Sequence, residues 1–229
     1  MSTKANKPQA TRTIAPAGTH VARVFKFMNL GTRFQEYKGV QKAYPDTLIN
    51  ISWELPTELN KFTVKKEDGT EEEVEKPFAI SREFTLSMGS KSNLRPFVEG
   101  IIGTSLSDDE AYNFDIESLL GMTSLITIAH KVASNGNTYA NVISASPLIK
   151  GMEEPPQVNE SAIFDVNKAT EEQIEALPTW LKEKVYESDE WKNRFDKDTA
   201  DRRKDIQDTV DKLRGVKPEE EITDADIPF

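Results

Sequence analysis

The chain has 229 residues, 25.8 kDa and no cysteine, which suits one well-filled domain with appended segments and excludes disulfides and cysteine-based zinc sites. The net charge of −10 is unevenly placed, because residues 1–150 carry 17 basic and 17 acidic side chains whereas residues 151–229 carry 12 and 22. Residues 1–45 hold eight Lys and Arg against one acid, and a basic front with an acidic tail favours a polyanion-binding surface and a segment that competes for it.

Three strands are expected in the first half of the chain, after a flexible basic arm over residues 1–16. Residues 19–28 are β-branched and aromatic and place apolar groups on both faces, which indicates a strand buried on two sides. Residues 47–55 alternate strictly between apolar and polar side chains, which is typical of a half-buried strand. Residues 78–88 form the third strand, and the charged stretch before it, around Asp68-Gly69, predicts a projecting hairpin.

One helix and a second hairpin complete the predicted domain. Apolar residues at helical spacing predict a helix over residues 94–101, with Pro96 in its first turn. The pattern also predicts a hairpin, with strands over residues 124–132 and 138–146 and a turn at Asn135-Gly136. This order predicts a mainly β fold, a five-stranded OB-fold barrel with a helix between strands 3 and 4. An SH3-like barrel or an α+β sheet covered by one helix is the alternative.

The composition changes after residue 150. Pro155-Pro156 and nearby acids indicate a linker, and a capping box at Thr170 starts a C-terminal helical extension, whose aromatic residues pack on the barrel or on a partner. The last apolar residues thin out into a disordered acidic tail. The predicted units are a basic arm over 1–16, an OB-fold domain over 17–150, a linker over 151–168, a helical extension over 169–196 and a tail over 197–229.

The connection from Gly31 to Pro45 is the strongest internal candidate for a binding site. Its cations can neutralise phosphates, and its rings offer faces on which unpaired bases stack. A solvated loop whose rings fold back onto the barrel is the alternative. The predicted single-stranded DNA contacts, which add four residues of the strands, are Lys26, Arg33, Phe34, Tyr37, Lys38, Lys42, Tyr44, Arg82, Lys131 and Tyr139.

The last six residues combine acids, an apolar tip and a terminal carboxylate. Ile227 and Phe229 are too apolar for an ordinary solvated end, and a carboxylate beside a ring suits an apolar pocket rimmed by Arg or Lys. A frayed acidic terminus is the alternative. The run Asp224, Asp226, Ile227, Pro228 and Phe229 resembles the C-terminal tip of bacterial single-stranded DNA-binding proteins. That resemblance implies a tip that binds replication, recombination and repair proteins.

A second resemblance covers about residues 18–147. The short runs that carry it are Gly31-Thr32 through Tyr37-Lys38-Gly39, Ser52-Trp53-Glu54-Leu55-Pro56, Phe84-Thr85-Leu86-Ser87 with Ser92-Asn93-Leu94-Arg95, and Leu119-Leu120-Gly121. They resemble a family of bacteriophage proteins that includes OB-fold single-stranded DNA-binding proteins. The resemblance implies sequence-independent binding and protection of single-stranded DNA during phage DNA replication, recombination and repair, and it leaves the oligomeric state open.

No enzyme and no cofactor are expected. His20 and His130 are isolated, and the sequence has no phosphate-binding glycine loop and no nucleophile elbow. Acidic runs at residues 71–73 and 108–110 leave a metal-dependent nuclease open, and the net charge leaves an acidic decoy or assembly protein that binds basic partners open. Without a signal peptide or an apolar span, the protein is expected in the cytoplasm, the host's if the chain is phage-encoded.

Overall fold

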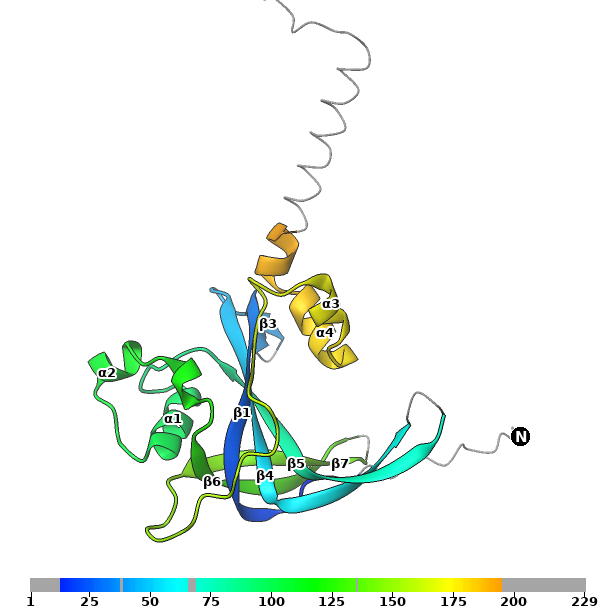
Figure 1. The fold of residues 1–229 in the computed structure, drawn as a ribbon. Helices are drawn as coiled ribbons and strands as arrows, with labels where there is room; N and C mark the ends of the chain where they lie inside the picture. Colours follow the sequence, from blue (N-terminus) through cyan, green and yellow to red (C-terminus); the bar gives the residue numbers. More distant parts are fainter. Residues whose placement is uncertain (1–12, 38, 66–68, 135, 195–229) are drawn as a thin grey trace, which may run out of the picture.

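A computed structural model describes residues 13–37, 39–65, 69–134 and 136–194 (Figure 1). The chain forms a mainly β structure with short helices at its periphery. Its elements are β1 (Gly18–Arg33), β2 (Glu36–Tyr37), β3 (Val40–Gln41), β4 (Asp46–Lys65), β5 (Glu71–Thr85), α1 (Leu94–Ile102), α2 (Asp108–Tyr112), the 3-10 turn η1 (Ile116–Leu119), β6 (Thr123–Val132), β7 (Thr138–Ser146), β8 (Ala162–Asp165), α3 (Glu171–Glu175) and α4 (Thr179–Tyr186).

The five long strands form one antiparallel sheet in the order β5-β4-β1-β6-β7. The sheet curls, so that its two edge strands approach each other. Arg82 on β5 donates a hydrogen bond of 2.5 Å to the carbonyl oxygen of Val142 on β7 across this seam. A curled antiparallel sheet of this kind is consistent with an OB-like barrel.

The inner face of the curled sheet encloses the main hydrophobic core. Trp53 is completely buried there, as its place on the apolar face of an alternating strand predicts. α1 closes the core with the buried face that its apolar spacing predicts, and the ring of Phe97 meets that of Phe84 at 5.0 Å. A Cβ at Gly100 would lie 2.2 Å from the carbonyl oxygen of Ala145, so glycine permits α1 to approach β7.

A second core is separate from the main core of the curled sheet and lies at the end of β1, where β1 joins the predicted binding loop. β6 pairs with residues 18–23 of β1, and β8 then runs parallel to residues 26–29, with α3 and α4 beside this end of the strand (Figure 1). This second core consists of Met28, Leu30, Leu48, Phe164, Val166, Ala169, Ile174, Leu177, Leu181 and Val185. Two-sided burial of the first strand was predicted, and the reason is that the strand contributes to two cores.

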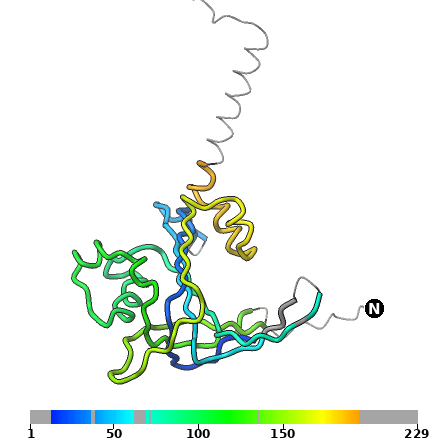
Figure 2. The backbone as a smooth tube through the Cα atoms, in the orientation of Figure 1, coloured from blue at the N-terminus to red at the C-terminus, as the bar shows by residue number. Residues whose placement is uncertain are grey.

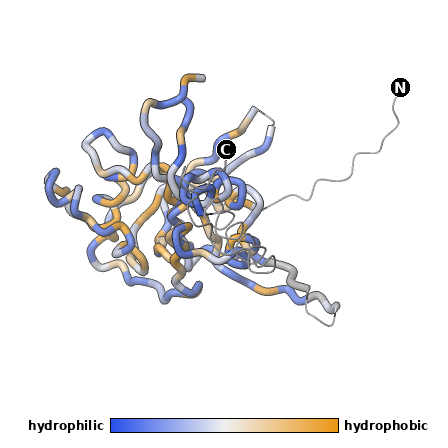
Figure 3. The backbone as a smooth tube through the Cα atoms, turned by 90° about the horizontal axis from the view of Figure 1, so that it is seen from above, coloured by the Kyte–Doolittle hydropathy of each residue, from blue (hydrophilic) through white to orange (hydrophobic). Residues whose placement is uncertain are grey.

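Several elements are longer than the sequence predicts. β1 continues to Arg33, because a register shift between Asn29 and Gly31 keeps it paired with β4. Pro56 does not end β4, because an irregularity between Leu55 and Leu59 absorbs it. β4 and β5 then stay paired through the charged hairpin, which projects from the sheet as expected (Figure 2). Hydrophobic stretches lie mostly in the interior of the molecule, and most outlying turns are hydrophilic (Figure 3).

The segment predicted to be a linker is attached to the barrel. Glu54 is fully buried and accepts hydrogen bonds from the backbone amides of Val158 and Asn159 at 3.0 and 2.7 Å, and from the Asn159 side chain at 2.7 Å. Arg23, which lies opposite Glu54 in the register, donates to the carbonyl oxygen of Pro155 at 2.7 Å. Residues 154–159 therefore form a strap across β1 and β4. Within the described ranges, no helix has the length and apolar composition needed to cross a bilayer.

Candidate nucleic-acid interface

The predicted binding loop contains a small hairpin. β2 and β3 pair within it, and Lys42 donates its backbone amide to Gln35 at 2.8 Å. Phe34 and Tyr44 are 50% and 81% exposed, so solvent reaches both side chains. Lys38 and the side chain of Tyr37 lie outside what the structure describes. Two of the three predicted rings are therefore accessible to a ligand.

A groove of about 520 Å³ lies next to this hairpin. Its walls come from the loop, the start of β4, the end of β5 and the turn before α1. The residues that line it are Gln35, Lys42, Asp46, Leu48, Arg82, Glu83, Phe84, Thr85, Ser87, Gly89, Lys91, Ser92 and Asn93. The fold thus brings together two cations predicted as DNA contacts, Lys42 and Arg82, and adds Lys91, which the sequence analysis missed.

The charges in the groove are arranged so that its two carboxylates are each paired with a lysine. Lys42 lies 2.5 Å from Asp46, and Lys184 of α4 forms an ion pair with Glu83. Lys91 is exposed and has no ion pair with another residue that the structure describes. An excess of positive charge remains and suits an anionic ligand.

Arg82 is the most buried cation of the groove. Its guanidinium lies 4.3 Å from the ring centre of Phe97 and 5.0 Å from that of Phe84, in addition to its bond to Val142. Burial lowers the pKa of Arg82, but an arginine stays charged at neutral pH. The same side chain therefore joins the two edge strands and contributes a fixed positive charge to the lining of the groove.

Four of the predicted DNA contacts, namely Arg33, Lys131, Tyr139 and Lys26, do not line the groove. Arg33 has a side chain only 11% exposed, which bonds to Glu187 at 3.1 Å and to the carbonyl oxygen of Lys184. A phosphate could reach it only by displacing these bonds. Lys131 and Tyr139 are register partners on β6 and β7, both exposed, and neither lines the groove.

Lys26 is half-buried on β1 between Ser52 of β4 and Ala162 of β8, so it also lies away from the groove lining. The residues predicted to bind partner proteins, Asp224, Asp226, Ile227, Pro228 and Phe229, lie outside the described residues.

The residues considered for metal binding have structural partners. His20 contacts Glu58 and the carbonyl oxygen of Pro16, both at 3.1 Å, and His130 contacts the carbonyl oxygen of Ala15 at 2.8 Å. Both histidines thus fix residues 15 and 16 against the barrel. Over the described ranges, no group of three or more His, Asp or Glu side chains is placed to hold a metal ion.

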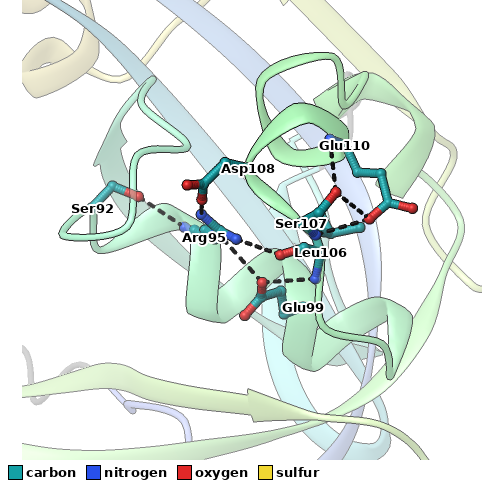
Figure 4. A network of polar contacts seen from close by, with 7 residues as sticks. All are labelled: Ser92, Arg95, Glu99, Leu106, Ser107, Asp108 and Glu110. Carbon is teal, nitrogen blue, oxygen red and sulfur yellow. Dashed lines mark hydrogen bonds and ion pairs between the residues drawn. The ribbon is translucent and has the colours of Figure 1, made fainter.

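The acidic run at residues 108–110 belongs to a polar network around α1 and α2 (Figure 4). Arg95 contacts Glu99 at 3.1 Å and Asp108 at 2.6 Å. Hydrogen bonds from the Leu106 amide and then from Arg95 lower the pKa of Glu99. Glu110 completes a capping box with Ser107. Hydrogen bonds from the backbone amide and then the hydroxyl of Ser107 lower the pKa of the Glu110 carboxyl group. These acids hold the segment between two helices in place.

No protein-family model matches the chain, and no curated protein or solved structure is significantly similar to it. Function is therefore inferred from the groove and its surroundings.

Proposed function

We propose that this protein binds single-stranded DNA without reading its sequence, with the groove as the path of the strand. The observation that carries the proposal is the position of two exposed rings, Phe34 and Tyr44, on the loop that forms one wall of a groove with three cations. Unpaired bases can stack on such rings, whereas the bases of a duplex are stacked on one another. The arrangement therefore favours a single strand.

The position of the groove within the fold supports the proposal. We take the barrel to be a five-stranded OB-fold with β1, β4, β5, β6 and β7 as its strands and α1 as the helix between the third and the fourth. In that fold, ligands contact the second and third strands and the loops that join strands 1 to 2 and 4 to 5. The groove is lined by the first of these loops together with β4 and β5.

The chemistry required is simple and involves neither a cofactor nor a catalytic step. Lys91 neutralises a phosphate directly, and Lys42 does so by exchanging its ion pair with Asp46 for one with a phosphate. Phe34 and Tyr44 each provide stacking worth about 1–3 kcal/mol per base. Stacking tolerates every base, because each has a π face. A protein of this kind coats and protects exposed strands in phage DNA replication, recombination and repair, and its acidic tail recruits partner proteins.

A titration of labelled oligo-dT at several salt concentrations tests the proposal. Fluorescence anisotropy is expected to show tight binding that weakens with salt, with the oligonucleotide intact afterwards and duplex DNA bound more weakly. The absence of binding at low salt would instead favour an acidic assembly protein. Shortening of the DNA that depends on Mg²⁺ would favour a nuclease.

Lys91 offers a direct check of the groove. Lys91→Ala is expected to weaken oligo-dT binding and to reduce the slope of log K against log salt by about 0.7, the value for one lost phosphate contact with a single strand. Lys150→Ala, which removes an exposed lysine that does not line the groove, is the matched control. Equal slopes for both variants and the parent would place the strand elsewhere.

A further inference from the structure

The C-terminal segment contacts the point where β1 enters the binding loop. The carboxylate of Glu190 accepts two hydrogen bonds of 2.7 Å from Thr32, one from its backbone amide and one from its hydroxyl. The Thr32 hydroxyl also lies 2.9 Å from that of Thr47 on β4. Burial raises the pKa of Glu190, but the bonds from Thr32 outweigh this effect and leave the pKa lowered. Glu190 is thus ionised and fixed at neutral pH.

The residues on either side of Thr32 contact the same segment. A Cβ at Gly31 would lie 2.6 Å from a carboxylate oxygen of Glu190 and 2.6 Å from the Cβ of Ser188, so this approach requires glycine. The φ angle of Gly31, +84°, disfavours other residues as well. Arg33 bonds to Glu187 and to the Lys184 carbonyl oxygen. Three consecutive residues at the root of the loop are therefore held by residues 184–190.

The helix α4, at the start of this segment, also affects the charge of the groove. Lys184 reaches from α4 to Glu83, which lines the groove on β5, and both side chains are about one-third exposed. A carboxylate without this partner would repel a phosphate that entered the groove. Lys184 does not line the groove itself, so its effect on a ligand passes through Glu83.

We infer that the segment from Lys184 to Glu190 is part of the nucleic-acid site rather than only a support for the fold. In this arrangement Lys184 cancels the charge of Glu83, and Glu190 is a positioning residue that fixes the root of the ring-bearing loop. The inference rests on the proposed single-stranded DNA binding. A parent protein that does not bind oligo-dT refutes that function, whereas a parent that binds but whose variants are unaffected refutes the inference alone.

A double-mutant cycle tests the charge effect in the full-length protein. Lys184→Met is expected to weaken oligo-dT binding at low salt roughly three- to tenfold. The reason is that the unpaired carboxylate of Glu83 would repel a bound phosphate across partly screening solvent. Glu83→Gln alone should bind at least as tightly as the parent, and the double variant should return to the parent's affinity. Lys182→Met, which breaks the pair of another lysine of α4 with Glu175, is the control and should bind unchanged.

The affinity of the double variant shows whether Lys184→Met weakens DNA binding through Glu83 or by another route. If the double variant binds as weakly as Lys184→Met, then Lys184 does not act through Glu83, and the charge part of the inference is wrong. Circular dichroism melts of the four proteins identify any loss that comes from unfolding, and a rescue cannot arise from unfolding.

Glu190→Gln tests the positioning effect, because electrostatics and geometry predict opposite results. Removal of a negative charge by itself favours DNA binding, whereas the amide can accept only one of the two bonds from Thr32. We expect a loss of affinity of about three- to tenfold and faster hydrogen exchange at the Thr32 amide. Glu183→Gln removes the same charge from an exposed position of α4 and should bind equally or more tightly. Glu190→Gln with unchanged or higher affinity would overturn the positioning role.

Discussion

Tyr44 and Phe34 leave much of their ring area in water, at 81% and 50% exposure. An apolar ring that stays hydrated contributes little to folding, because the hydrophobic gain depends on the area removed from water. The same ring area becomes useful when a base covers it. At the scale of single residues, the loop is thus better suited to binding than to stability.

Tyr44→Ala is expected to weaken single-strand binding by about 1–3 kcal/mol for every base composition and to leave the melting temperature unchanged. The charge of the protein is the same, so the salt dependence should also stay the same. Trp180→Ala, which removes a ring 48% exposed on α4 and outside the groove lining, is the control. Titrations with oligo-dT and oligo-dA measure the effect, and equal losses in both variants would disqualify Tyr44 as a stacking platform.

Part of the candidate site could be predicted from the sequence. Tyr44 and Lys42 were predicted as DNA contacts because rings and cations occur together within one loop, and the residues of a short loop remain close together in any fold. Lys91 and Lys184 were missed, since their approach to the groove depends on how a turn and a helix far along the chain are packed. Arg33 carries the same charge as its neighbours in the loop, and only the structure shows that its guanidinium bonds to α4.

At the scale of elements, the strap over β1 and β4 shows how a proline-rich segment is held without secondary structure. The carboxylate of Glu54 and the guanidinium of Arg23 face it from neighbouring strands, one accepting from its amides and the other donating to its carbonyl oxygen. Buried carboxylates need such partners, because desolvation is costly. The strap therefore supplies hydrogen-bond partners to the Glu54 carboxylate and to one terminal nitrogen of the Arg23 guanidinium.

Glu54→Gln is expected to lower the free energy of unfolding by about 2–4 kcal/mol, because an amide group would face the donors of Val158 and Asn159 in a buried site. Urea denaturation measures the loss, and hydrogen exchange at both amides should accelerate. Glu160→Gln removes an exposed acid next to the strap and should change stability by less than about 0.5 kcal/mol. Normal protection of the two amides in Glu54→Gln would show that the strap is held by other contacts.

Long periodic elements could be predicted, and short ones that depend on distant partners could not. The hairpin of β6 and β7 and the buried face of α1 were predicted from patterns within one continuous stretch of chain. β8 has only four residues, and it forms because Lys26–Asn29 of β1 offer an unpaired edge. No local pattern contains that information. The continuation of β4 past Pro56 was missed for a similar reason, since a bulge in a paired strand tolerates the proline.

At the scale of the whole molecule, the uneven charge is the dominant feature. The net charge of residues 1–150 is zero, and the whole excess of acidic residues lies in residues 151–229. A tethered acidic segment acts at a high effective concentration on any basic surface within its reach. We therefore predict competition between the tail and DNA.

Deletion of residues 219–229 removes five acidic side chains and is expected to raise oligo-dT affinity, most clearly at low salt where screening is weakest. Deletion of Phe229 alone keeps these acids, so DNA binding should stay the same while binding to a replication or repair protein that recognises such tips is lost. Anisotropy and calorimetry measure the two effects. Unchanged DNA affinity in the longer deletion at low salt would exclude the competition.

The division of β1 between two cores has a consequence for the protein during synthesis. The five long strands of the curled sheet are complete at Ser146, whereas the residues that cover Met28, Leu30 and Leu48 extend to Val185. The ribosome adds about 5–20 residues per second, so roughly 40 residues take about 2–8 s. During that interval the nascent sheet presents an uncovered apolar patch to chaperones and to other nascent chains. Chains that terminate early, near residue 150, would keep this patch permanently and are expected to aggregate.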